Sequence, residues 1–198
     1  MSIVPIVQAG DPVLRTRAVD VPVQGIAAPE IQGLIDDMID TMRAAPGVGL
    51  AAPQVGRSLR IIVVEDPPEA IGRLTDAQRM ERSRTQPFGL RVFINPMLRF
   101  VGAGRTTFPE GCLSIPGYAA LVERSLRVEV SSFDRAAVRH DWTAFEGWPA
   151  RILQHEVDHL DGTLYTDRMI ARSFMTEEHM KSRTAERPIA AVLHDLGL

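Results

Sequence analysis

Residues 148–160 read WPARILQHEVDHL, and this stretch predicts the helix around which the rest of the chain folds. Pro149 suits the first turn of a helix because its missing N–H has no intrahelical partner there, and Gly162 suits a position just past the end. Within this helix His155 and His159 lie one turn apart and roughly 40° apart around the axis. Both imidazoles can therefore reach one metal ion.

Glu156 follows the first histidine and completes an H-E-x-x-H pattern. It lies roughly 100° around the helix from His155, so its carboxylate is expected next to the bound ion and not among the ligands. A carboxylate in this position can act as a base toward a water molecule at the metal. The pattern also occurs by chance, but its place inside a helix with a defined start and end favours a metal site.

The remainder of the chain predicts one more amphipathic helix, several short strands and a C-terminal helix. Apolar residues between Pro29 and Pro46 recur at a helical period, and residues 66–90 are polar enough to be an insertion between strands. Strands are expected at 59–65, 91–96, 98–101, 106–108, 121–133 and 138–145, and further helices near 75–84 and at 176–187. We therefore predict an α+β fold in which short antiparallel sheets pack around the central helix that carries H-E-x-x-H, with a helix at the C-terminus.

The composition is that of an ordinary globular domain, and we expect one domain over residues 1–198. Hydrophobic residues make up 45% of the chain and charged residues 24%, which argues against a disordered or fibrous protein. The net charge of -3 indicates no basic patch for nucleic acid. Because no signal peptide and no apolar run of roughly 20 residues is visible, we expect a protein of a reducing compartment without membrane contact.

Two histidines leave a catalytic metal one protein ligand short, because such sites usually have three protein ligands and an open position. The segment Glu177-Glu178-His179 offers candidates, but it is polar and typical of a solvent-exposed surface. The alternative is Cys112, the single cysteine, whose thiolate would be a strong ligand although an isolated cysteine is more often a small buried side chain. Gly111 before it lets the backbone approach a bound group, and Glu110 needs a partner if buried.

Three segments together resemble a known family. The sequences GVGLAAPQ at 47–54, EGCLS at 110–114 and HEVDH at 155–159 match, in this order, the three motifs of the peptide deformylases. All three motifs together are specific, whereas H-E-x-x-H alone is not. The sequence GWPARI at 147–152 and the insertion are more similar to the subgroup that contains organellar and some bacterial members.

The resemblance implies a peptide-deformylase-like catalytic domain and a metal site. In that family Cys112, His155 and His159 would be the metal ligands, with water in the fourth position. The family favours Fe(2+), and Ni(2+), Co(2+) or Zn(2+) can substitute. The implied reaction is hydrolysis of the N-formyl group from formyl-methionine at the start of new polypeptides, with release of formate.

The resemblance also implies which groups act on the substrate. Glu156 would take a proton from the attacking water and pass it to the leaving amine. The side-chain amide of Gln54 and the backbone N–H of Leu113 would stabilise the oxyanion that forms on the formyl group. A loop glutamine read alone more often bonds to backbone, so this role for Gln54 depends on the GLAAPQ context.

Residues next to the motifs are expected to bind the substrate. Gly49 would let the substrate backbone lie alongside as an added strand, and Gly111 would let it approach the metal. Val48 and Ile152 are candidates for an apolar methionine pocket, although each is ordinary core without the family. Many bacterial members have arginine where this chain has Ala119, so the way the peptide beyond methionine is held is expected to differ.

Glu110 and Arg124 are expected to support the site without touching the metal. The family pattern makes Arg124 the charge partner of Glu110, and Glu110 would hold both the cysteine loop and Gln54. Without the family, the alternative is an exposed ion pair that contributes less than about 1 kcal/mol.

The expected partners are N-formylmethionyl nascent peptides at the ribosome, and the expected compartment is the bacterial cytoplasm, although a mature organellar chain would look the same. Two other functions are compatible with the residues. One is an H-E-x-x-H peptidase that cuts internal peptide bonds, which would use a third ligand other than Cys112. The other is a non-catalytic metal-binding module, which would not need Glu156.

Overall fold

The computed structural model describes residues 2–185 and 187–198. The strands are β1 (Gly49–Ala51), β2 (Ile61–Asp66), β3 (Phe88–Phe100), β4 (Arg105–Cys112), β5 (Ile115–Ser125), β6 (Arg127–Phe133), β7 (Arg139–Glu146) and β8 (Met175–Thr176). The α-helices are α1 (Pro29–Ala44), α2 (Pro68–Gly72), α3 (Asp76–Glu81), α4 (Trp148–Leu160), α5 (Glu177–Thr184) and α6 (Ile189–Asp195). None of the described helices is long and apolar enough to cross a membrane.

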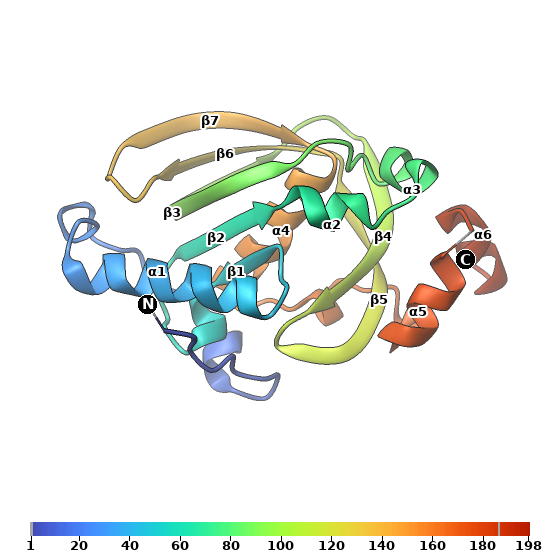
Figure 1. Cartoon of the computed structure of the whole chain (residues 1–198), viewed down its shortest axis with the longest axis horizontal. Helices are drawn as coiled ribbons and strands as arrows, with labels where there is room; N and C mark the ends of the chain where they lie inside the picture. Colours follow the sequence, from blue (N-terminus) through green and yellow to red (C-terminus); the bar gives the residue numbers. More distant parts are fainter. Residues whose placement is uncertain (1, 186) are drawn as a thin grey trace.

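The strands form two antiparallel sheets, one of order β1-β2-β3-β6-β7 and one of order β4-β5-β8. Helix α4 contacts β1, β2, β3 and β7 of the first sheet and β5 of the second. In Figure 1 it crosses the middle of the molecule behind β1 and β2. The predicted α+β architecture around this helix is confirmed, and the helix has the predicted bounds.

Strand β2 shows why the core has two parts. Ile61 and Val63 pack against α1 in one apolar cluster, whereas Ile62 and Val64 pack with residues of α4 in another. Successive side chains of a strand point to opposite faces, so one continuous apolar run serves both clusters. Helix α1 therefore covers one face of the larger sheet and α4 the other (Figure 1).

The single strand predicted over 121–133 is wrong, because two strands in different sheets occupy this segment. Strand β5 ends at Ser125 in the smaller sheet, and β6 begins at Arg127 in the larger one. The side chain of Gln154 on α4 forms hydrogen bonds with both backbone polar groups of Ser125 at this junction. Ser125 N–H donates to Gln154 Oε1 at 3.0 Å, and Gln154 Nε2 donates to the Ser125 carbonyl at 2.9 Å.

The C-terminal residues dock on the smaller sheet instead of extending as a tail. Met180, Ile189 and Val192 are buried there against Leu121 and its neighbours. The helix predicted over 176–187 is too long, since α5 ends at Thr184 and a second helix, α6, follows Pro188. Proline cannot continue a helix because it lacks the N–H and its ring collides with the preceding turn.

Candidate metal centre

Three side chains that can ligate a metal ion meet between α4 and the end of β4. The ligand atoms of Cys112, His155 and His159 all lie within 4.8 Å of one another. Sγ of Cys112 is 3.3 Å from Nε2 of His159. Because the histidines lie one turn apart on α4 and the cysteine is the last residue of β4, two separate elements build this cluster.

The cluster fits a divalent metal ion by its chemistry and by the atoms that it leaves unpaired. One thiolate and two imidazoles suit Fe(II), Co(II), Ni(II) or Zn(II). His155 donates its Nδ1–H to Glu110 at 3.0 Å, which leaves Nε2 free to bind the ion. Among the described residues, Glu156 Oε2 and His159 Nδ1 are buried without a hydrogen-bond partner. Since buried polar atoms are normally paired, these atoms indicate that an ion, water or substrate completes the cluster.

The downstream residues that were alternatives for the third ligand do not join the cluster. His179 and Glu178 are exposed. Glu177 comes near the site, because its Oε1 lies 3.5 Å from the position that a Cβ atom on Gly111 would take, and its Oε2 is 3.6 Å from Lys181 Nζ. In the part of the chain that the structure describes, none of them belongs to a metal-ligating group. Cys112 is the residue that completes the cluster.

Glu156 lies beside the histidines and is only 4% exposed. Burial raises the pKa of its carboxyl group to about 7, because desolvation disfavours the charged form. Gly49 of β1 provides the space for this side chain, since a Cβ atom there would overlap the Glu156 carboxylate. A carboxyl group with a pKa near neutrality can both accept and return a proton.

Gln54 reaches the cluster from the short 3-10 helix after β1. Its Oε1 accepts the Ala51 N–H at 2.8 Å, which turns the amide nitrogen toward the metal ligands. Nε2 lies 3.5 Å from Cys112 Sγ and 3.4 Å from Ser114 Oγ. Leu113 follows the cysteine in the turn between β4 and β5, so its backbone N–H lies next to the same ligand.

Glu110 is buried two residues before Cys112 and accepts four hydrogen bonds. Arg124 donates from Nε and Nη2 at 2.9 and 2.8 Å, Arg151 donates from Nη1 at 2.6 Å, and His155 donates at 3.0 Å. Burial alone would raise the pKa of Glu110, but the hydrogen bonds from Arg124 and His155 hold it well below its usual range. The ionised carboxylate therefore fixes the orientation of the His155 ring.

The expectation that Glu110 also holds Gln54 is wrong. All four of its hydrogen bonds go to Arg124, Arg151 and His155, and the Gln54 side chain bonds instead to Ala51 and the cysteine loop. The two residues reach the cluster from different elements, β4 and the helix after β1, and each side chain has its own hydrogen-bond partners.

Arg151 was not identified as a site residue from the sequence. It lies one helical turn before His155, and residues four apart share a helix face, so this spacing was the available signal. Asp158 of α4 lies next to His159. It joins Arg124 to Arg168, which donates two hydrogen bonds at 2.6 and 2.7 Å.

The proposed substrate-binding residues border the same region. Val48 and Ile152 belong to one apolar cluster with Trp148, and Ile152 is buried while Val48 is half-buried. A Cβ atom on Gly111 would lie 3.4 Å from the Tyr118 carbonyl, so the backbone is closely packed there.

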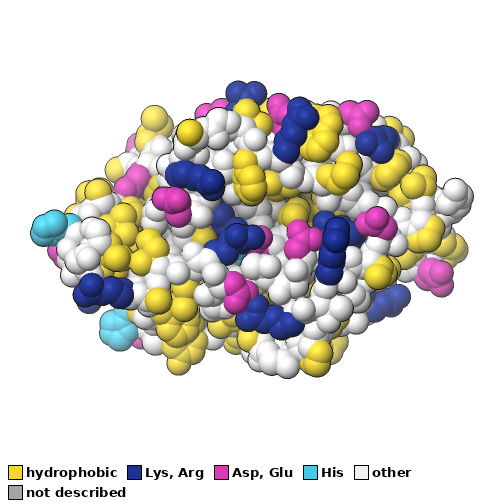
Figure 2. All heavy atoms as spheres, turned by 180° about the vertical axis from the view of Figure 1, so that it is seen from behind, with side chains coloured by type: hydrophobic (Ala, Val, Ile, Leu, Met, Phe, Trp, Pro, Cys, Tyr) yellow, Lys and Arg dark blue, Asp and Glu magenta, His cyan; other side chains and the backbone are white. Residues whose placement is uncertain are grey.

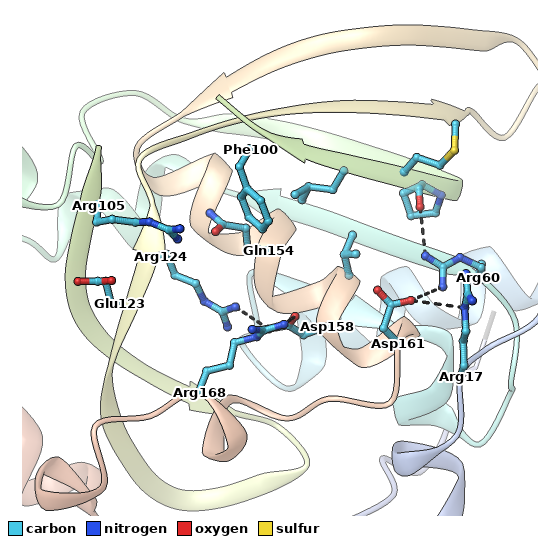
Figure 3. Close-up of a pocket in the computed structure, with 14 residues that line it drawn as sticks. Arg17, Arg60, Phe100, Arg105, Glu123, Arg124, Gln154, Asp158, Asp161 and Arg168 are labelled. Atoms are coloured by element: carbon cyan, nitrogen blue, oxygen red, sulfur yellow. Dashed lines mark hydrogen bonds and ion pairs between the residues drawn. The ribbon is translucent and has the colours of Figure 1, made fainter. Parts of the chain in front are cut away.

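The opposite face of α4 lines a separate groove of about 400 Å³, which we call the rear groove. Figure 3 shows its walls, with Phe100 of β3 on one side and Arg124 and Arg168 on the other. Figure 2 shows that basic and acidic side chains are interspersed on this rear face of the molecule. Many of these charges are paired, for example Arg60 with Asp161 at 2.7 Å.

Comparisons with known proteins agree with the motifs. The sequence model of the family described as polypeptide deformylase matches residues 3–174. The chain is 48% identical over 195 residues to the chloroplast peptide deformylase 1A of Solanum lycopersicum, covering 98% of this chain and 67% of that protein. It is 50% identical over 178 residues to peptide deformylase 1 of Streptomyces coelicolor, covering 89% and 78%. The chain thus spans about two thirds of the length of its plant relatives.

A solved structure shows the same likeness. The crystal structure of a class I type b peptide deformylase from Acinetobacter baumannii with Met-Ala-Ser bound superposes with a TM-score of 0.74 at 33% identity. The match covers 85% of this chain and all of that one. The relatives include plant organellar and bacterial proteins, as the sequence of the α4 segment suggested. With the three motifs gathered around one buried cluster, the chain belongs to the polypeptide deformylase family.

Proposed function

We propose that this chain is a peptide deformylase that removes the formyl group from N-formylmethionine at the start of new polypeptides and releases formate. The observation that carries the proposal is the buried Cys112, His155 and His159 cluster with the unpaired carboxylate oxygen of Glu156 beside it. Membership of the polypeptide deformylase family supports the same reaction. We propose that residues 1–198 work as one catalytic domain.

Cys112, His155 and His159 would hold a divalent metal ion, which we propose to be Fe(2+), with Ni(2+), Co(2+) or Zn(2+) as substitutes. When bound, such an ion acts as a Lewis acid that polarises the formyl carbonyl and makes water a better nucleophile. A donor set of one thiolate and two imidazoles supports this range of metals.

Glu156 would move the proton. It takes a proton from the attacking water as the oxygen adds to the formyl carbon, and it returns this proton to the amine when the carbon–nitrogen bond breaks. A pKa of about 7, raised by burial, suits both directions of transfer at neutral pH. One water is consumed, and the products are formate and a free amino terminus.

Gln54 and Leu113 would stabilise the negative charge that develops on the formyl oxygen. Hydrogen-bond donors that are already aimed at this position act strongly in a site from which water is excluded. The contact between Ala51 N–H and Gln54 Oε1 supports this role, because it fixes the amide with its N–H groups toward the cluster.

The peptide would lie along β1 beside Gly49, because β1 is at the edge of the larger sheet and can accept an added strand. Val48 and Ile152 would contact the methionine side chain, and Gly111 would allow close approach beside Cys112. Ala119 supplies no charge in this region, so we propose that residues beyond methionine are held by backbone contacts.

The biological substrates would be nascent chains at the ribosome, in the bacterial cytoplasm. Relatives from both bacteria and plant organelles are compatible with this setting and with an organellar one. A peptidase that cuts internal bonds is less well supported, because such enzymes take a third histidine or glutamate downstream of H-E-x-x-H, and this cluster contains Cys112.

The test is formate release from formyl-Met-Ala by protein loaded with Fe(2+) under anaerobic conditions. We expect stoichiometric formate and Met-Ala, with no cleavage of the Met-Ala bond. The variant Glu156→Gln is the matched control, and it should bind the metal normally without releasing formate. Metal-loaded wild-type protein that releases no formate would refute the proposed function, and cleavage of internal bonds would favour the peptidase.

A further inference from the structure

Arg151 is a buried arginine on α4 that has no role in the reaction described above. It is only 3% exposed and lies one helical turn before the metal-ligand candidate His155. A buried guanidinium is costly unless its donors are paired, so its contacts show what it holds in place.

The guanidinium of Arg151 joins α4 to both long strands of the smaller sheet. Nη1 donates to the Val122 carbonyl of β5 at 3.0 Å, and Nη2 donates to the Thr106 carbonyl of β4 at 2.6 Å. Nη1 also donates to Glu110 Oε1 at 2.6 Å. One side chain thus fixes the separation between the helix with the two histidines and the strand with the cysteine.

Glu110 transmits this position to the metal centre. Arg151 and Arg124 both bind its Oε1, while Oε2 accepts from Arg124 and from His155 Nδ1. Arg151 and His155 therefore hold the same carboxylate from two successive turns of α4. With Oε1 occupied by two arginines, Oε2 is directed to the histidine.

The two arginines on Glu110 are not equivalent. Arg124 also binds Asp158, which is held in turn by the half-exposed Arg168, and Figure 3 shows these side chains together at the rear groove. Among the described residues, the Arg151 guanidinium donates its hydrogen bonds to Glu110 and to the backbone of β4 and β5. Arg151 is thus the partner of Glu110 that comes from the helix of the two histidines.

We propose that Arg151 is a positioning residue of the metal centre. By holding Glu110 against α4 it sets the distance between Cys112 on β4 and the two histidines, and so determines how tightly the metal is retained. This inference rests on the proposed metal ligands but not on the reaction assigned to them.

The test uses full-length protein loaded with Co(2+), whose release to a chelator is followed by the thiolate-to-cobalt absorption. Loss of a group that orients a ligand typically weakens metal binding about 10–100-fold, so we expect Arg151→Met to release cobalt faster by about this factor. The matched control is Arg60→Met. Arg60 is also buried and binds the Leu160 and Pro96 carbonyls near the other end of α4, but it contacts no ligand and no Glu110 oxygen.

Both variants are expected to lower thermal stability, and only Arg151→Met should accelerate metal release. Equal rates for the two variants, or a wild-type rate for Arg151→Met, would overturn the proposal. If the methionine variants do not fold, Arg151→Lys is compared with Arg60→Lys. A lysine keeps the charge but cannot span Glu110 and a backbone carbonyl in the same way, so faster release from Arg151→Lys is again expected and equal rates overturn the idea.

Cobalt retention is read without substrate, so this measurement is decided independently of formate release. A protein that fails to deformylate but loses cobalt faster as Arg151→Met would refute the proposed reaction and leave the positioning role supported. If the wild-type protein deformylates normally and Arg151→Met releases cobalt at the wild-type rate, the proposed reaction is supported and the positioning role is refuted.

Discussion

The two faces of α4 both carry charged and ionisable side chains, but they differ in how these side chains are paired. On the face with His155 and His159, buried polar atoms of His159 and Glu156 have no hydrogen-bond partner among the described residues. On the face toward the rear groove, Asp158 binds two arginines and Asp161 binds Arg60. The unpaired Glu156 oxygen lies beside the candidate metal ligands, and the paired charges belong to the scaffold.

This difference shows that a large charged cavity is a weaker indicator of function than an incomplete buried cluster. Five arginines line the rear groove, but most of them form ion pairs with aspartates of the protein. Arg60 pairs with Asp161, and Arg124 and Arg168 pair with Asp158. The ligand atoms of the metal centre, by contrast, lie within 4.8 Å of one another, as binding of one ion requires. Mutations on the two faces should therefore have very different effects.

The largest effect is expected for Cys112→Ala, which removes the only candidate metal ligand that β4 contributes and leaves the two histidines of α4. Two histidines on one helix turn leave the ion without its third protein ligand. We expect no metal to remain bound after gel filtration, and formate release at background. Asp161→Asn on the rear face is the control, and metal analysis should show one equivalent. Full metal content in Cys112→Ala would contradict the ligand assignment.

The next largest effect is expected for Glu156→Gln, which keeps the size of the side chain and removes the base. General acid–base groups typically contribute about 10²–10⁴-fold, so kcat should fall by this factor while the metal content stays normal. Steady-state kinetics with formyl-Met-Ala measure kcat, and metal analysis measures the metal content separately. A kcat within a few-fold of wild type would remove Glu156 from the mechanism.

Helix α4 and its metal-binding pattern could be predicted because their signals are local. Pro149 and Gly162 mark the two ends, and the positions of His155, Glu156 and His159 on the helix follow from its periodicity alone. The helical periodicity does not indicate which distant segment completes the cluster. Gly111 and Glu110 beside Cys112 favoured this residue over 177–179, and the family resemblance implied it as a ligand.

The remaining differences arise where tertiary contacts override local pattern. Strands predicted at 91–96 and 98–101 form one strand, β3, because Asn95 adopts φ 51° and its side chain bonds to the Val21 backbone at 2.8 Å through both amide atoms. Such a bulge keeps the strand continuous while shifting its register. The break between β5 and β6 within 121–133 is stabilised by Gln154 of the distant helix α4, which bonds to the Ser125 backbone. The sequence of the segment itself gives no signal for this break.

A smaller effect is expected for Gln54→Glu, which retains the oxygen that accepts Ala51 N–H and removes the amide donor aimed at the cluster. Loss of one such donor typically lowers kcat about 10²–10³-fold. Because Gln54 is only 2% exposed, the buried carboxyl group should also lower thermal stability, so the melting temperature is measured beside kcat. Kinetics would speak against this role if Gln54→Glu retained wild-type kcat, or if only KM changed.

The smallest effect is expected for Arg168→Ala on the rear face. Arg168 is 48% exposed, and Asp158 keeps its second partner, Arg124, so the buried carboxylate stays paired. Half-exposed ion pairs contribute about 0.2–1 kcal/mol, and the unfolding free energy should fall by no more than this, as measured by urea denaturation. Because Glu110 and His155 keep all their hydrogen bonds, kcat and metal content should match wild type. If Arg168→Ala slowed formate release as much as Gln54→Glu, the two faces of α4 would be coupled through Asp158 and Arg124, and the division between a scaffold face and a catalytic face would be wrong.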